Sequence, residues 1–468
     1  MRGRVAGGVM RGHWTKSGAQ IQSNLPDSVD PPARLRESFA MAAHNPFFIL
    51  PFVLLLGAMA FAPVLAPRWW LKNYARVALG LGAATVGGYV FILRDAASLA
   101  HTAHEYFSFM VIGGALYVVS GGIHIGVKGA ATPFRNVIFL LTGAVVANFL
   151  GTTGAAMLLI RPWIRMNQNR IAAHHIVFFI FIIANVGGCL TPIGDPPLFL
   201  GYLQGVPFWW VAKNCWPMWI VGVGLLLAMF YVVDKINFVR DPRKNCSVEP
   251  AAQPVGAQRQ RCTEKWEFNG LPNLFFLAVI LGAVFVKMIF VREVLMIAAA
   301  LGSYFTTKKS VHAANDFDFH PVIEVAILFA GIFATMTPAL GWLNFHAREI
   351  LGANPSPGVF YWGAGGLSAV LDNAPTYLGF LNALFGATGA KDIADLLGQN
   401  PLHILAISIG SVFFGAATYI GNGPNFMVKA IADRQKIPTP TFFGFVFKYA
   451  LTFLIPVTFC VWLIFFHR

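Results

Sequence analysis

The chain has 468 residues, of which 56% are hydrophobic and only 12% are charged, and its mean hydropathy is +0.62. Soluble domains carry roughly a quarter of charged residues, so this composition excludes an ordinary soluble protein and predicts a polytopic membrane protein. The net charge of +14 comes from Lys and Arg between apolar runs, which fits membrane topology better than nucleic-acid binding. The five cysteines lack metal-ligand spacing, so neither a disulfide framework nor a metal centre is indicated.

Residues 1–45 are polar and rich in Arg, Gly and Pro. They lack the apolar core of a cleavable signal peptide. We predict a disordered tail for this segment.

Twelve apolar segments follow, and most are long enough to span a bilayer. They begin near positions 46, 75, 106, 136, 171, 214, 271, 293, 322, 358, 402 and 441. Two of them, 136–160 and 358–384, carry polar, small or helix-breaking residues at mid-length, around Asn148 and Asn373. Such residues at mid-depth predict re-entrant hairpins with polar tips.

A further segment, 171–204, contains the stretch Asn185-Val-Gly-Gly-Cys-Leu-Thr-Pro-Ile-Gly-Asp195-Pro-Pro197. Proline has no N–H and clashes with the preceding turn, so a regular helix cannot continue through it. In hydrocarbon, a broken helix is tolerated where its freed backbone groups line a polar cavity. We therefore predict a discontinuous helix here, with a functional acid at its break.

The order of segments then repeats. Thr191-Pro-Ile-Gly194-Asp195 in the first half resembles Thr418-Tyr-Ile-Gly421-Asn422 in the second, which predicts a second broken helix at 402–432. Similar intervals also separate Asn148 from Asp195 and Asn373 from Asn422.

This duplication predicts an all-α polytopic membrane protein with about ten transmembrane helices plus two re-entrant hairpins. We expect a first repeat at 46–233, a linker at 234–269 and a second repeat at 270–468. Five crossings per half make the repeats inverted, an arrangement that places binding sites at the midplane. Most Lys and Arg beyond the tail fall on the linker's side, so the positive-inside rule makes the linker cytoplasmic.

Two acids, Asp195 and Asp372, lie one in each half, with no basic residue nearby in sequence. A carboxylate at mid-depth either coordinates a cation or takes up a proton, and both suit exchange of Na⁺ for H⁺ at a shared acid. The structural alternative is that Asp195 caps a helix starting at Pro196 and that Asp372 is a turn residue. His124, in the span before the first hairpin, is a further candidate as a proton relay.

Burying a side-chain amide without hydrogen-bond partners is costly, because the amide carries two donors and an acceptor. We therefore favour a functional role for Asn148, Asn373, Asn422 and Asn425. Hydroxyls are more ambiguous, since Thr152, Thr153, Thr376 and Thr418 can equally satisfy backbone carbonyls within a membrane.

The inverted halves, the Asn- and Thr-bearing hairpin tips and the broken helices resemble the ion transporter superfamily, which includes NhaD-type sodium/proton antiporters, arsenite permeases and citrate permeases. Ala184-to-Asp195 and Ser368-to-Pro375 are similar to the signatures of the NhaD-like and citrate permease-like members, and the resemblance covers about 46–466. It implies a homodimer whose transport domain moves as an elevator. Ion or substrate contact is implied at Asn148, Thr152, Thr153, Thr191, Gly194, Asp195, Asp372, Asn373, Thr376, Thr418, Asn422 and Asn425.

The sequence therefore predicts a secondary active transporter in the inner (plasma) membrane, a sodium/proton antiporter that binds Na⁺ at Asp195 and Asp372. A cation-coupled permease for citrate or another organic acid is the first alternative, and arsenite export is a weaker one. An intramembrane aspartyl enzyme is the rival from another class. No phosphate-binding GxxxxGK[ST] motif is present, so ATP-driven transport has no support, and we expect no cofactor beyond the transported ions.

Overall fold

The computed structural model describes residues 46–467, except 94, 129–130, 241–264, 287, 289 and 353. The predicted tail at 1–45 and most of the predicted linker lie outside these residues. Helices dominate the described chain, and the expectation of an all-α fold is modified by one pair of short strands.

The first half begins with η1 (Pro46–Ile49), α2 (Leu50–Leu65), α3 (Pro67–Gly88), the π-helix η2 (Tyr89–Leu93) and α4 (Ala96–Gly121). The rest of this half comprises β1 (His124–Lys128), α5 (Pro133–Asn167), α6 (Ala173–Ile182), η3 (Val186–Gly188), α7 (Pro196–Leu203) and α8 (Phe208–Arg240).

The second half starts with β2 (Lys265–Asn269), α9 (Asn273–Ala283), α10 (Val291–Thr306), α11 (Lys309–Ala314) and α12 (His320–Leu351). It continues with α13 (Pro357–Ser368), α14 (Asn373–Thr388), α15 (Ile393–Gln399), α16 (Pro401–Phe414), η5 (Gly415–Ala417) and α17 (Gly423–Arg434). It ends with α18 (Phe442–Gly444), the π-helix η6 (Phe445–Leu454) and α19 (Ile455–Phe465).

Helix α5 doubles back on itself. A straight helix of its 35 residues would be about 50 Å long, yet the side chains of Asn136 and Asn167 exchange hydrogen bonds of 2.8 and 3.1 Å across its two ends. The turn is at Gly151, whose φ of 72° and ψ of 156° are not helical. The segment is therefore a helical hairpin with a first arm up to Leu150 and a second arm from Thr152.

A second hairpin joins α13 to α14. The rings of Phe360 and Phe380 lie 6.3 Å apart, and a side chain at Gly363 would meet the same Phe380 ring, so the two helices run back against each other. The turn between them ends at Asp372, which is the N-cap residue of α14.

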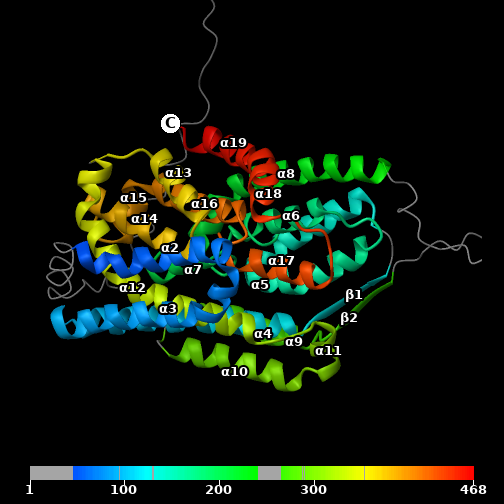
Figure 1. Cartoon of the computed structure of the whole chain (residues 1–468), viewed down its shortest axis with the longest axis horizontal. Helices are drawn as coiled ribbons and strands as arrows, with labels where there is room; N and C mark the ends of the chain where they lie inside the picture. Colours follow the sequence, from blue (N-terminus) through cyan, green and yellow to red (C-terminus); the bar gives the residue numbers. More distant parts are fainter. Residues whose placement is uncertain are drawn as a thin grey trace, which may run out of the picture.

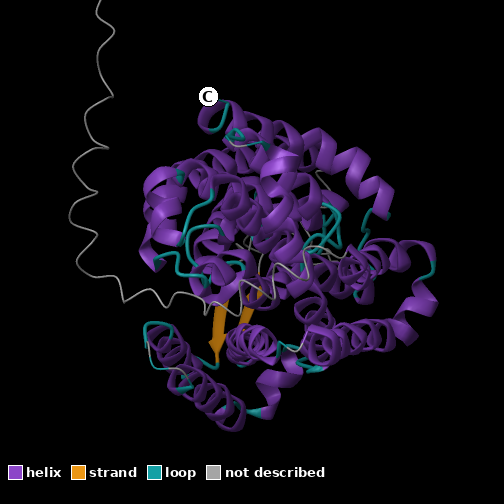
Figure 2. Cartoon of the chain, turned by 90° about the vertical axis from the view of Figure 1, so that its left-hand side faces the viewer, coloured by secondary structure: helices purple, strands orange, loops and turns teal. Residues whose placement is uncertain are grey.

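The elements form layers across the molecule. Figure 1 shows α3, α4 and α10 along the lower side and α8 and α19 along the upper side, with α5, α6 and α17 between them. β1 and β2 pair antiparallel, with His124 opposite Asn269. Figure 2 shows these two strands as the only sheet within an otherwise helical body of described residues.

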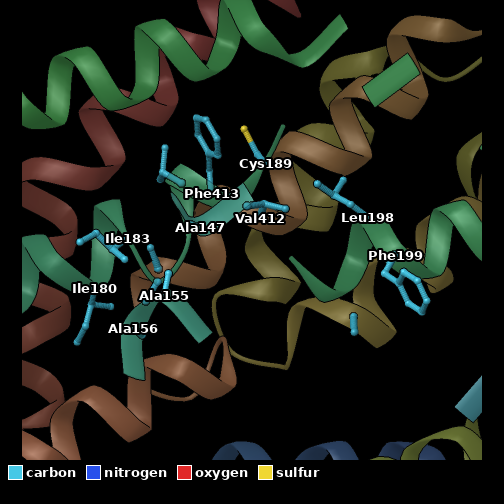
Figure 3. Packing of buried hydrophobic residues seen from close by; sticks show 14 of the residues in the cluster. Ala147, Ala155, Ala156, Ile180, Ile183, Cys189, Leu198, Phe199, Val412 and Phe413 are labelled. Atoms are coloured by element: carbon cyan, nitrogen blue, oxygen red, sulfur yellow. The ribbon is translucent and has the colours of Figure 1, made fainter. Parts of the chain in front are cut away.

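One continuous apolar core joins the broken helices to the hairpin. Figure 3 shows Ala147, Ala155 and Ile183 packed together, and Val412 and Phe413 of α16 reach the same cluster. All five side chains are buried. Small residues on α5 let the first broken helix approach closely, as in other membrane bundles.

Five helices among the described residues are long and apolar enough to cross a membrane, or six if the bent pair α15 and α16 counts as one span. Large apolar side chains are exposed on the outside, with Phe91 at 81% and Phe305 at 77%. Such a surface is stable in lipid and not in water. The fold is that of a multi-pass membrane protein.

The base of the α5 hairpin is fixed by a buried charge pair. Asp234, near the end of α8, accepts hydrogen bonds of 2.5 and 2.9 Å from the guanidinium of Arg170 and one of 2.9 Å from Asn136. The predicted linker therefore starts too early, because α8 continues to Arg240 and its Asp234 is a core residue.

Replacing Gly151 by Ala should lower the free energy of unfolding by about 1–3 kcal/mol, because its backbone conformation is one that only glycine adopts readily. Thermal unfolding of the purified protein in detergent measures this change. Gly80→Ala is the matched control, since Gly80 is helical with open space around it and should tolerate the methyl group. Equal melting temperatures for the two variants would contradict a strained hairpin turn.

Candidate functional site

The break between α6 and α7 places Asp195 in the centre of the molecule. Asp195 is the N-cap residue of α7 with extended backbone angles, and it is 1% exposed. Its side chain makes no capping hydrogen bond to α7. The alternative that Asp195 serves only as a helix cap is therefore wrong.

The carboxylate of Asp195 instead accepts hydrogen bonds from three other elements. Thr152 Oγ1 donates to Oδ1 at 2.7 Å, Asn373 Nδ2 donates to Oδ2 at 2.6 Å, and Asn422 Nδ2 donates to Oδ1 at 3.1 Å. These donors come from the tips of both hairpins and from the second helix break. The four polar segments singled out in the sequence thus converge on one acid.

Four helix N-termini meet at this carboxylate. They belong to the second arm of α5, which starts at Thr152, and to α7, α14 and α17, whose first turns hold Asp195, Asn373 and Asn422. A helix N-terminus carries a partial positive charge and favours an anion. The protein itself provides that anion through Asp195.

The two helix breaks share one backbone geometry. Asp195 has φ −143° and ψ 143°, and Asn422, 227 positions later, has φ −154° and ψ 140°. In both breaks a threonine hydroxyl, of Thr191 or Thr418, accepts from the N–H of a glycine, of Gly194 or Gly421. The same threonines donate to the opposing hairpin, at Asn148 O and Ala369 O.

These contacts change one correspondence drawn from sequence spacing. Asn148 is matched by Ala369, and the residues four positions later, Thr152 and Asn373, are the two that donate to Asp195. The expected equivalence of Asn148 and Asn373 in the two halves is therefore wrong by four residues, about one helical turn.

Close backbone approach explains the glycines of the breaks. A Cβ atom on Gly194 would lie 2.0 Å from the carbonyl oxygen of Gly188, and one on Gly421 would lie 2.6 Å from that of Gly415. The backbone N–H of Thr152 also donates to Gly194 O at 2.7 Å. Any larger residue at Gly194 would force the break open.

Asn148 joins the first hairpin to the first break. Its Nδ2 donates to Gly187 O at 2.7 Å, and its Oδ1 accepts from the N–H of Leu190 at 2.8 Å. All its amide groups are therefore used on the backbone, and the residue does not touch Asp195 directly. Its contacts are those of a residue that positions the site.

Asp372 makes a different set of contacts from Asp195. Its Oδ1 caps α14 by accepting from the N–H of Ala374 at 3.0 Å, and its carbonyl oxygen accepts from Thr376 Oγ1 at 3.0 Å. The structural alternative for Asp372, a turn residue at the tip of the second hairpin, matches this geometry. Thr376 likewise satisfies a backbone carbonyl of its own helix.

Asn185 and Asn425 connect the two breaks behind Asp195. Asn185 Nδ2 donates to Asn425 Oδ1 at 2.7 Å, and Asn422 Nδ2 lies 3.1 Å from Asn185 Oδ1. Asn185 is fully buried. It was not a candidate site residue, although its position as the first polar residue after a long apolar run marks it in the sequence.

A cavity of about 140 Å³ opens beside Asp195, room for roughly ten water molecules. Thr152, Thr153, Gly194, Asp195 and Asn422 line its polar side. Apolar residues of α4 and α12 line the remainder, among them Phe109 and Val325. Of the described residues in this lining, Asp195 alone is charged.

A second cluster of titratable residues lies away from this cavity. The side chains of His174, His175 and Asp234 bring ligand atoms within 4.8 Å of one another, the spacing of a metal site. Arg170, however, donates to both oxygens of Asp234. A guanidinium bound there repels a cation, so we read the cluster as a clamp at the hairpin base.

His124, the candidate proton relay, is not part of the cavity lining. Its Nδ1 is 2.8 Å from Asn315 Oδ1, and its Nε2 is 3.3 Å from Arg165 Nη1. Because Asn315 Oδ1 can only accept and the Arg165 guanidinium can only donate, these contacts fit Nδ1 as donor and Nε2 as acceptor.

Comparison with known families agrees with this architecture. A family model described as "Putative citrate transport" matches residues 41–466. The chain belongs to this family. No curated protein matches it.

Membership identifies the chain as a member of the citrate permease-like branch of the ion transporter superfamily and hence as a membrane transporter. Membership in a transport family argues against an intramembrane aspartyl enzyme, because transport does not require hydrolysis of a substrate.

Removing the hydroxyl of Thr152 while keeping its shape, as in Thr152→Val, should destabilise the protein by about 1–3 kcal/mol, because the Asp195 carboxylate loses a donor it cannot replace. Thr153→Val is the matched control, since the Thr153 hydroxyl makes no hydrogen bond to any described residue and lies half-buried in the same cavity. Chemical denaturation in detergent would compare the two. Equal losses would show that the Thr152 hydroxyl does not support Asp195.

Proposed function

We propose that this transporter is a sodium/proton antiporter that exchanges the two cations at Asp195. The observation that carries the proposal is the charge of the cavity: one buried carboxylate and no basic side chain among the described lining residues. A buried acid without a cationic partner is costly in its charged form. Binding either Na⁺ or H⁺ removes that cost, and the two ions then compete for one site.

Oxygen ligands for Na⁺ are present around the carboxylate. Thr152 offers its hydroxyl, and the Oδ1 atom of Asn373 is buried without a hydrogen-bond partner among the described residues. Unwound backbone at the two breaks supplies carbonyl groups of the kind that hold Na⁺ in other broken-helix transporters. Asp372 lies at the edge of this set, where it caps α14.

The shared geometry of the two breaks supports an inverted repeat, with a first repeat from 46 to the end of α8 at Arg240 and a second at 270–468, separated by a cytoplasmic linker. In such an arrangement the site lies at the midplane and is opened alternately to each side. The two hairpins and broken helices would move together as the elevator, in a homodimer held by the remaining helices in the plasma membrane.

The family match favours a second candidate, a cation-coupled permease for citrate or another organic acid. Four helix N-termini facing one cavity suit an anion. Asp195 already occupies their meeting point, so a polycarboxylate could share the cavity only when a bound cation or proton neutralises that acid.

Proteoliposomes with an imposed pH gradient distinguish these functions. Adding Na⁺ or Li⁺ should move protons in the parent protein, and Asp195→Asn should abolish the movement, because the amide can neither ionise nor exchange a proton. Internal pH is followed with a trapped dye. A proton flux that requires citrate and ignores Na⁺ would replace the antiporter by the permease.

Asp372→Asn is the matched control. Asparagine can still accept from the N–H of Ala374, so the cap of α14 is kept while the charge is removed. Exchange should survive in this variant. Loss of exchange in both variants would instead make the two acids joint ligands of the transported cation.

A further inference from the structure

A buried arginine lies between the cavity and the linker side of the protein. Arg161, on the second arm of α5, is 5% exposed, and its Nε and Nη1 atoms make no hydrogen bond to any described residue. Unpaired donors of a buried charge are costly. Such a group is suited to a ligand that arrives with an acceptor.

Arg161 lies beyond the cavity lining on the same helix arm. Gly154 of the same arm and Met427 of α17 line the cavity, and Arg161 and Arg434 follow them by seven residues each, on the same helix faces. Two helical turns amount to roughly 10 Å. Tyr117, which also lines the cavity, lies within the electrostatic influence of both arginines.

The loop after α11 covers this position. Tyr117 donates from its hydroxyl to Asp318 O at 2.8 Å, and Asn315 Nδ2 donates to Gly121 O at 2.8 Å. Asn315 Nδ2 also donates to Ile123 O at 2.8 Å, and together these contacts hold the loop, with its Asp316, beside Arg161.

Asp316 of this loop already presents a carboxylate to Arg161. Its Oδ2 is 3.5 Å from Arg161 Nε, longer than the usual range of about 2.7–3.2 Å for an N–H···O hydrogen bond, and its side chain is 73% exposed. Its backbone has a positive φ of 42°, which few residues other than glycine adopt. The pair is therefore loose, and a better-placed carboxylate can displace Asp316.

We propose that Arg161, with Arg165 and Arg434 nearby, forms a binding site for a small polycarboxylate anion on the linker side of the cavity, and that Asp316 is its internal competitor. A guanidinium can bind one carboxylate through two parallel hydrogen bonds, and the additional positive charges favour a ligand that carries more than one carboxylate. Both ring nitrogens of His124 are engaged by Arg165 and Asn315, so His124 offers no free donor to the anion. The site does not depend on ion exchange at Asp195.

The test is citrate binding to the full-length protein in nanodiscs of zwitterionic lipid, measured by titration calorimetry. Arg161→Gln should weaken binding by at least about tenfold, the loss expected for a charge-assisted contact. Asp316→Asn should strengthen binding severalfold, because the competing carboxylate is neutralised. Arg348→Gln, which removes an exposed charge far along α12, is the control and should leave binding unchanged.

If Arg161 and Asp316 formed only a structural ion pair, Arg161→Gln and Asp316→Asn would not change citrate affinity in opposite directions. Unchanged citrate binding in Arg161→Gln, no binding by the parent protein, or weaker binding in Asp316→Asn would each overturn the proposal. Arg161→Lys is a control for loss of binding through misfolding. It keeps the positive charge but loses the bidentate contact, so it should retain part of the affinity for citrate. Triethyl citrate, which carries no charge, should not bind.

Two further measurements separate this site from the proposed exchange at Asp195. Asp195→Asn should keep citrate binding even where it abolishes ion exchange, so the two ideas fail independently. Uptake of labelled citrate into proteoliposomes would identify the bound anion as cargo. A citrate effect on Na⁺-driven proton flux without uptake would identify it as an effector, and both outcomes support the site.

Discussion

The structure depends on how one buried carboxylate is accommodated. Asp195 has no basic partner among the described residues, and it is held by donors from Thr152, Asn373 and Asn422, which lie on three segments distant in sequence. Each donor stands at the start of a helix, so the partial charges of the helix ends add to the hydrogen bonds. Both hairpins and both breaks are thereby arranged around a single negative charge. The two halves of the chain can meet here because each brings a broken helix with the same backbone path.

Local chemistry made part of this arrangement predictable. Pro196 and Pro197 fix the start of α7 directly after Asp195, since proline is best suited to the first turn of a helix. Glycines before the acid indicate where backbone segments approach closely, and Gly194 meets the Gly188 carbonyl as that reasoning requires. Polar residues within apolar segments also indicated which parts of the chain face a cavity.

Other features depend on tertiary contacts that one sequence does not contain. Spacing matched Asn148 with Asn373, but the intervals around each break differ, and only the hydrogen bonds show that Thr152 is the true counterpart. Asn185 was missed because its partners, Asn422 and Asn425, lie in the other half of the chain. Asp234 was assigned to the linker from its polar neighbours, whereas its burial is decided by Arg170.

The clamp between Asp234 and Arg170 has a consequence for membrane voltage. Moving one elementary charge through the membrane potential changes the free energy by about 2.3 kcal/mol per 100 mV. Asp234 and Arg170 are paired at the base of the α5 hairpin, so a body that contains both carries no net charge from them. The pair then adds nothing to the electrical work of any such movement, whereas Asp195 contributes according to what it holds. An empty, ionised Asp195 senses the field, and an Asp195 with one bound monovalent cation does not.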